Sequence, residues 1–145
     1  MHPRIPRRAP NAGFSLAELM VVIVIIGLLA AVVVPNVLQR LGRAQVGSAK
    51  AQITIFESSL NEYAIQNGGR FPDSLDALVE KDASGNSYIE ADKVPMDPWG
   101  HEYFFEPPNP GNSRFRVGSY GADGEPGGEG DALDIDNIMI KNGEI

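Results

Sequence analysis

An unbroken apolar run near the N-terminus constrains this chain more than any other feature. The run extends from Leu19 to Val34, and residues 14–34 as a whole contain one charged side chain, that of Glu18. A helix of about 20 apolar residues, each adding about 1.5 Å, spans the hydrocarbon core of a bilayer. A soluble domain of this size does not need a helix that is apolar on every side. We therefore predict a transmembrane helix over residues 14–35.

The residues that flank this run predict its orientation. Residues 1–13 carry three arginines and no acidic residue, so the positive-inside rule keeps them in the cytoplasm and sends the rest of the chain across the membrane. A conventional secretory signal has a shorter apolar core followed by a small-residue cleavage site. Here Pro35-Asn36-Val37 follows instead. We therefore expect a single-pass anchor, with residues 36–145 on the far side.

Composition excludes several classes of function. The chain has 145 residues and a net charge of −7, from 12 basic and 19 acidic residues. A duplex-binding surface needs a basic footprint, so we expect no nucleic-acid partner. Cysteine is absent and only two histidines occur. These counts exclude a disulfide framework, a thiol nucleophile, a thiolate zinc site and a histidine-rich metal site.

Apolar spacing beyond the run predicts an α+β fold. Apolar residues recur at spacings of three or four over 36–67, which indicates that the helix continues as an amphipathic one. The expected apolar stripe includes Val37, Leu41, Ala44, Ala51, Ile55, Leu60 and Ala64. The segment 71–79 has the pattern of a second helix, and 103–105 with 114–117 reads as a β-hairpin. Ile138-Met139-Ile140 is expected to close the sheet. The long helix then packs on a small antiparallel sheet.

Asp97-Pro98-Trp99-Gly100 predicts a tight turn, because Pro98 fixes φ and Gly100 tolerates a positive φ. Such a turn would carry Trp99 onto the core, the alternative being an exposed aromatic contact for a partner. His101 follows the turn with no second histidine and no paired nucleophile near it in sequence, so we interpret it as structural or solvated.

An acidic, glycine-rich segment is the one candidate for a ligand site. Residues 121–136 contain five glycines, six acids and no base. Calcium takes six to eight carboxylate and carbonyl oxygens, which fits this composition, although no EF-hand pattern is present. Composition alone leaves a solvated acidic loop equally open.

Glu18 is anomalous because a carboxylate within the bilayer costs a few kcal/mol, which makes an intramembrane acid a functional hypothesis. The alternative is that it lies at headgroup depth. Gly13-Phe14-Ser15-Leu16-Ala17-Glu18 before an apolar run resembles the processing motif of type IV pilin-like proteins. The resemblance implies that a prepilin peptidase cuts between Gly13 and Phe14, removing residues 1–13, and that the Phe14 amine is N-methylated. Glu18 would then pair with the terminal amine of a neighbouring subunit.

Two further elements narrow the resemblance. Pro-Met-Asp-Pro-Trp-Gly-His-Glu-Tyr, at 95–103, and Ser-Tyr-Gly-Ala-Asp-Gly, at 119–124, resemble the major pseudopilins of bacterial type II secretion. The resemblance covers residues 13 to about 136. It implies a major structural subunit that polymerises into a short periplasmic filament, the pseudopilus, and drives export of folded proteins across the outer membrane.

The same resemblance implies the partners and the location. The partners are further copies of the chain, minor pseudopilins, an inner-membrane assembly platform with its cytoplasmic ATPase, and the prepilin peptidase. The chain would be anchored in the bacterial inner membrane with its C-terminal domain, residues 36–145, in the periplasm.

Resemblance to this family also implies one structural calcium in the acidic loop. The implied ligands are the side chains of Asp123 and Asp134 and the backbone carbonyls of Tyr120 and Glu125. Asp131 is expected to contribute from a shifted position, because Leu133 stands where some members have a further Asp.

Two other functions were weighed. A type IV pilin of a surface fibre shares the N-terminal motif, but many such pilins close the C-terminal region with a disulfide, which a chain without cysteine cannot form. A membrane-tethered hydrolase would need a nucleophile paired with a base, and only Ser119 and His101 suggest themselves. We therefore expect no enzymatic activity.

Overall fold

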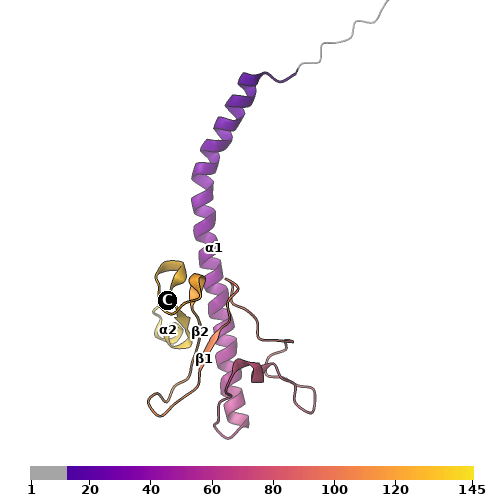
Figure 1. The fold of residues 1–145 in the computed structure, drawn as a ribbon, viewed down its shortest axis with the longest axis vertical. Helices are drawn as coiled ribbons and strands as arrows, with labels where there is room; N and C mark the ends of the chain where they lie inside the picture. Colours follow the sequence, from indigo (N-terminus) through magenta and orange to yellow (C-terminus); the bar gives the residue numbers. More distant parts are fainter. Residues whose placement is uncertain (1–12) are drawn as a thin grey trace, which may run out of the picture. The chain divides into compact units, whose positions relative to one another are not determined.

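The computed structural model describes residues 13–145, apart from the side chains of residues 35, 36 and 38. Residues 1–12, which make up nearly all of the expected leader peptide, lie outside the described part. The chain divides into two compact units, Met1–Gln39 and Arg40–Ile145, and each is described by itself. Helix α1, Leu16–Gln66, contributes to both (Figure 1), and its bounds confirm the predicted long helix.

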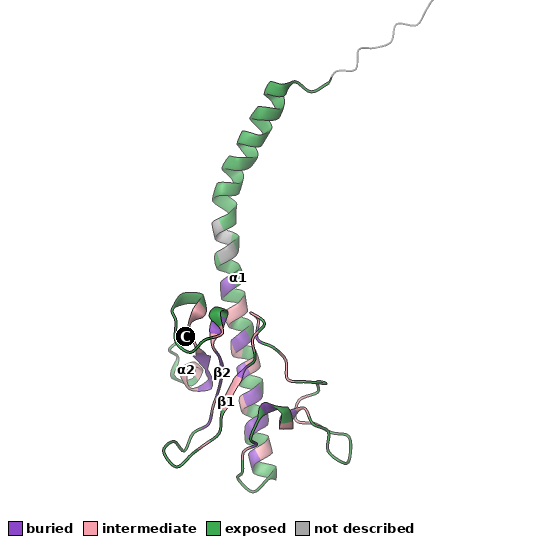
Figure 2. Cartoon of the chain, in the orientation of Figure 1, coloured by how far each residue is buried: buried purple, intermediate pink, exposed green. Residues whose placement is uncertain are grey.

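The described part of the first unit presents an apolar helix surface. Every residue from Gly13 to Val34 is exposed (Figure 2). By length and composition this part of α1 is able to cross a membrane. An apolar surface of this extent is not stable in water, so it requires lipid or other apolar helices around it.

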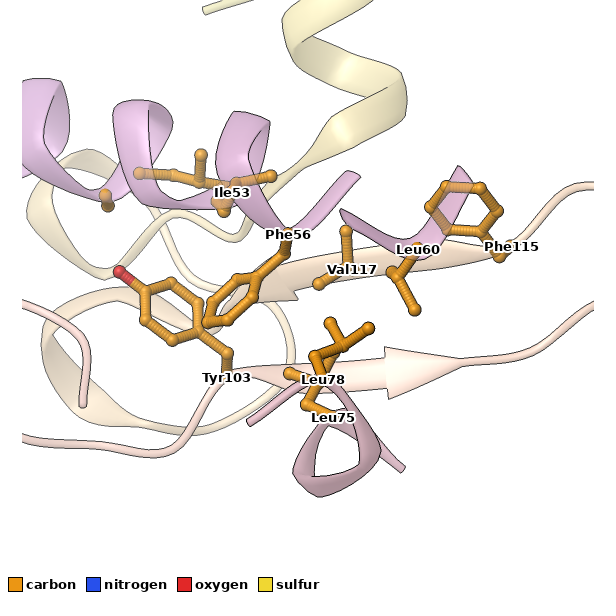
Figure 3. Packing of buried hydrophobic residues seen from close by; sticks show 10 residues of the cluster. Ile53, Phe56, Leu60, Leu75, Leu78, Tyr103, Phe115 and Val117 are labelled. Atoms are coloured by element: carbon orange, nitrogen blue, oxygen red, sulfur yellow. The ribbon is translucent and has the colours of Figure 1, made fainter. Parts of the chain in front are cut away.

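The second unit is built on the amphipathic part of α1. The predicted spacing of three to four residues is confirmed, but the buried face is a different one: Val37, Leu41, Ala44, Ala51 and Ile55, which were expected on the apolar stripe, are exposed. The fully buried positions of this helix are Ala49, Ile53, Phe56 and Leu60. Figure 3 shows them meeting side chains from the rest of the unit, including Tyr103 and Val117. The rings of Phe56 and Tyr103 meet edge to face, with centroids 5.0 Å apart.

Three short antiparallel strands form one sheet, in the order β1 (Phe104–Glu106), β2 (Arg116–Ser119) and β3 (Ile135–Asp136). Phe105 pairs with Val117, and Ser119 pairs with Ile135. The predicted hairpin is therefore confirmed as β1–β2, and the α+β class with it. The segment between β2 and β3 contains the acidic loop.

Two sequence-based expectations need correction. Ile138–Ile140 do not close the sheet but lie in helix α2, Asn137–Asn142, while β3 takes the edge position. The cause is Asp136, whose Oδ1 accepts hydrogen bonds from the backbone nitrogens of Ile138 and Met139 and so caps a helix. The helix expected over 71–79 is reduced to one 3₁₀ turn, Leu75–Leu78, whose N-cap Ser74 makes no capping hydrogen bond.

Candidate functional site

Ser15 and Glu18 form a reciprocal pair at the start of α1. The Ser15 backbone nitrogen donates to Glu18 Oε2 at 2.8 Å, and the Glu18 nitrogen donates to Ser15 Oγ at 3.2 Å. This is a capping box, which satisfies two backbone donors that a helix start leaves free. This capping role of Glu18 was not predicted from the sequence. The spacing Ser-x-x-Glu before an apolar run is the signal that would have found it.

The expected cleavage site lies just outside the helix. Gly13 and Phe14 precede α1, and the Phe14 side chain is 85% exposed. Glu18 is exposed as well, with one carboxylate oxygen engaged by Ser15. In the isolated chain, the cleavage position and the acid are thus both accessible to a partner.

Asp97 organises the predicted turn. Its buried carboxylate accepts hydrogen bonds from the backbone nitrogens of Trp99 (3.0 Å) and His101 (2.8 Å) through Oδ1, and from Ser119 Oγ (2.5 Å) through Oδ2. Gly100 has φ +93° and its nitrogen closes the turn onto the Asp97 carbonyl. Trp99 packs against the core. The turn and the inward Trp99 are therefore confirmed.

His101 has a specific partner in the acidic loop. Its Nδ1 lies 3.1 Å from the carbonyl oxygen of Gly121, and that oxygen can only accept, so Nδ1 carries the proton. The ring also packs against Gly124, where a Cβ would lie 3.0 Å from it. His101 is thus structural, as interpreted, but its link to the loop was not visible in the sequence.

The geometry gives Ser119 no catalytic partner among the described residues. Its side chain is fully buried, and its hydroxyl donates to Asp97 rather than to His101. A nucleophile must reach both a base and a substrate. The Ser119–His101 pairing that a hydrolase would need is therefore not formed.

The acidic loop folds back on itself between two single 3₁₀ turns, Gly121–Asp123 and Gly130–Ala132. Both carboxylate oxygens of Asp134 accept the Gly127 nitrogen, at 3.0 and 3.1 Å. Gly121, with φ +73°, lies so close to the returning chain that a Cβ would come within 2.9 Å of the carbonyl oxygens of Asp131 and Leu133. Two backbone carbonyl oxygens therefore lie close to the start of the loop.

The five expected calcium ligands have different surroundings in the structure. Asp123 Oδ1 accepts the Glu125 nitrogen at 3.2 Å, and the Glu125 side chain is exposed. The Asp131 carboxylate instead lies over α1, where a Cβ on Gly42 would come within 2.8 Å of its Oδ1. Among the described residues, no three acidic, histidine or cysteine side chains gather as a metal site would require. Calcium prefers hard oxygen ligands, a class to which the carboxylates of Asp123 and Asp134 and the backbone carbonyls of the loop belong.

Arg116 fastens the far end of the loop to the sheet. Its Nη2 donates to Asp136 Oδ2 at 2.7 Å, and its Nη1 lies 3.3 Å from Glu106. The hydrogen bond to Asp136 is the largest cause of the raised pKa of Arg116. The guanidinium also lies over the Phe104 ring, which stacks on Tyr120 with centroids 4.5 Å apart. Both ends of the loop are thereby held by β2 and its neighbours.

Comparison with known proteins identifies the family. Residues 36–138, more than half of the chain, match the family described as type II secretion system (T2SS), protein G. The chain belongs to this family. Residues 8–34 match the prokaryotic N-terminal methylation motif. The motif and the exposed apolar helix together indicate a membrane-anchored subunit of this secretion system.

Individual members of the protein G family agree over nearly their whole length. Type II secretion system core protein G of Pseudomonas aeruginosa is 38% identical over 143 residues, covering 90% of this chain and 97% of that protein. The Vibrio cholerae protein of the same name is 38% identical over 142 residues, covering 91% and 94%. The crystal structure of the major pseudopilin from the type 2 secretion system of enterohaemorrhagic Escherichia coli aligns with a TM-score of 0.55 at 30% identity, covering 74% of this chain and 98% of that chain. These matches favour a pseudopilin over a surface-fibre pilin, and a structural subunit over an enzyme.

Proposed function

We propose that this chain is the major structural subunit of a type II secretion pseudopilus, a short periplasmic filament that drives export of folded proteins across the outer membrane. The match of residues 36–138 to the protein G family carries this proposal. The apolar part of α1 supports it, since an exposed apolar helix suits both lipid and a bundle of identical helices. The chain is stored in the inner membrane and moves from there into the filament.

The N-terminal motif is the site at which the chain is processed, and it sets the register between neighbouring subunits. A prepilin peptidase cuts between Gly13 and Phe14, and the new Phe14 amine is N-methylated, in line with the methylation motif. Glu18 then pairs with the Phe14 amine of a neighbouring subunit, so that two opposite charges in an apolar bundle offset each other's desolvation. The Glu18 oxygen not held by Ser15 is available for that amine.

Partner proteins supply the energy for growth of the filament. The sequence carries no nucleotide-binding motif, so a cytoplasmic ATPase acting through an inner-membrane assembly platform adds each subunit. Minor pseudopilins complete the filament. Residues 40–145 form a unit with its own core, and this unit faces the periplasm.

Loss of the chain is expected to block secretion. In a strain lacking it, folded substrates of the system accumulate in the periplasm, and a copy supplied in trans restores their export. The measurement is the share of one folded exoprotein in the medium and in the periplasm. Normal export from the deletion strain, together with this chain in fibres on the cell surface, would contradict the proposal and favour a pilin.

Calcium is the ligand that we propose for the acidic loop. The Asp123 and Asp134 carboxylates and the carbonyls of Tyr120 and Glu125 would hold the ion, with Asp131 reaching it only after turning away from α1. When bound, the ion supplies positive charge that relieves repulsion among the carboxylates of the loop. The support is the all-oxygen donor set, to which the carbonyl oxygens of Asp131 and Leu133 beside Gly121 could add.

Calcium is therefore expected to raise the thermal stability of the full chain in detergent micelles. At a hundred times the dissociation constant, a native-state ligand adds about 2.7 kcal/mol, which corresponds to a shift of roughly 10 °C for a domain of this size. The shift between calcium and chelator should vanish in Asp123→Ala. It should persist in Glu129→Ala, which removes an exposed acid of the same loop outside the ligand set. If the wild-type chain melts at the same temperature in calcium and in chelator, the loop does not bind calcium and is a solvated acidic loop.

A further inference from the structure

Two consecutive peptide groups at the start of the acidic loop are held by side chains. The Gly121 nitrogen donates to Ser119 Oγ at 3.0 Å. The Gly121 carbonyl accepts from His101 Nδ1 at 3.1 Å. These contacts fix the peptide that enters Gly121 and the peptide that leaves it.

Both contacts lead back to Asp97. Its Oδ2 accepts the Ser119 hydroxyl, and its Oδ1 accepts the backbone nitrogen of His101. Because the Ser119 hydroxyl gives its single hydrogen to Asp97, its oxygen is left to accept from Gly121. Asp97 is 5% exposed and Ser119 is fully buried, so the hydrogen bond between them is shielded from water and strengthened accordingly. The His101 side chain is 38% exposed.

The network determines where proposed calcium ligands point. The Gly121 N–H and the Tyr120 carbonyl belong to one planar trans peptide, in which they point in opposite directions. Anchoring the N–H on Ser119 therefore directs the Tyr120 carbonyl away from Ser119. The bond from His101 fixes the next peptide in the same way, and Asp123 follows directly after it.

We propose that Asp97, Ser119 and His101 are positioning residues that set the calcium affinity of the acidic loop by orienting the Tyr120 carbonyl before the ion binds. This inference rests on the proposed calcium site. A ligand oxygen that is already oriented does not have to be ordered when the ion binds. The free-energy cost of binding is therefore smaller, and the affinity for calcium is higher. Sequence reasoning about the loop alone would place all determinants of affinity between residues 120 and 134, whereas this network extends them to the turn at 97–101.

Two substitutions at His101 test the inference. His101→Leu keeps an apolar side chain against Gly124 but removes the hydrogen-bond donor. His101→Asn provides an amide nitrogen that is separated from the backbone by the same number of bonds as Nδ1. Calcium chloride is titrated into the full chain in detergent micelles by calorimetry, and melting is measured with calcium and with chelator. We expect His101→Leu to bind calcium about fivefold more weakly, the effect of one hydrogen bond, and His101→Asn to recover most of the loss.

A purely structural role gives a different result. It would lower the melting temperature equally in calcium and in chelator and leave the calcium affinity unchanged, which would overturn the inference while the calcium site stood. Failure of the wild-type chain to bind calcium would overturn both. A larger loss of melting temperature in calcium than in chelator, seen in His101→Leu and reversed in His101→Asn, supports the positioning role.

Discussion

Glu18→Ala is expected to abolish pseudopilus assembly and secretion while leaving residues 40–145 folded. In the proposed filament the carboxylate neutralises the Phe14 amine of a neighbouring subunit within an apolar bundle. Removing one partner of a buried ion pair leaves the other charge uncompensated, at a cost of about 3–5 kcal/mol per contact. Since the contact repeats at every subunit, even the lower figure prevents stable polymerisation. The measurements are export of a folded exoprotein and the yield of filaments.

The capping box provides the control for this experiment. Glu18→Ala also removes a helix cap, which by itself is worth about 1 kcal/mol. Ser15→Ala removes the hydroxyl that accepts the Glu18 nitrogen but keeps the carboxylate. If the pairing account is right, Ser15→Ala secretes nearly normally and Glu18→Ala does not. Equal defects in the two variants would assign the role of Glu18 to helix capping, and normal filaments from Glu18→Ala would refute the pairing.

Asp97→Ala is expected to destabilise the second unit strongly. It removes the acceptor of three hydrogen bonds at a buried site, those from Trp99, His101 and Ser119. Each buried donor left without a partner costs about 1–3 kcal/mol. We expect the free energy of unfolding to fall by about 3–5 kcal/mol, measured by chemical denaturation in chelator.

Asp82→Ala is the matched control, because it also removes an aspartate that accepts two backbone hydrogen bonds in a turn. Its Oδ1 accepts the nitrogens of Ser84 and Asn86, at 2.8 and 2.9 Å. Asp82 is exposed, so water replaces the lost acceptor and the expected cost is about 1 kcal/mol or less. Similar losses at the two positions would show that the Asp97 network contributes no more than an ordinary surface turn.

The sequence predicted those features whose signals are local. The apolar run and the three-to-four spacing that follows it define α1 to within two residues at its start and one at its end, because a helix face repeats every turn. The turn at 97–100 was equally predictable, since Pro98 and Gly100 restrict the backbone where they stand. The hairpin followed from two apolar segments separated by a proline-rich loop.

Features that depend on long-range contacts were missed. A local helix cap was missed as well: Ile138–Ile140 have the apolar pattern of a strand, but the Asp136 carboxylate accepts from the nitrogens of Ile138 and Met139 and makes the segment helical. Asp131 lies in the acidic loop by sequence, but its carboxylate faces Gly42, some 90 positions earlier. The bond from His101 to Gly121 likewise spans 20 positions. No local pattern encodes these pairings of Asp131 and His101.

The most direct test of the central claim is the intact mass of this chain recovered from purified filaments. Cells that overproduce the chain together with its secretion system supply the filaments, which are separated from the membrane fraction before analysis. The account predicts that filaments contain the chain, and that its mass corresponds to a polypeptide that begins at Phe14 and carries one methyl group. A chain found only in the membrane fraction, still carrying residues 1–13, would contradict it.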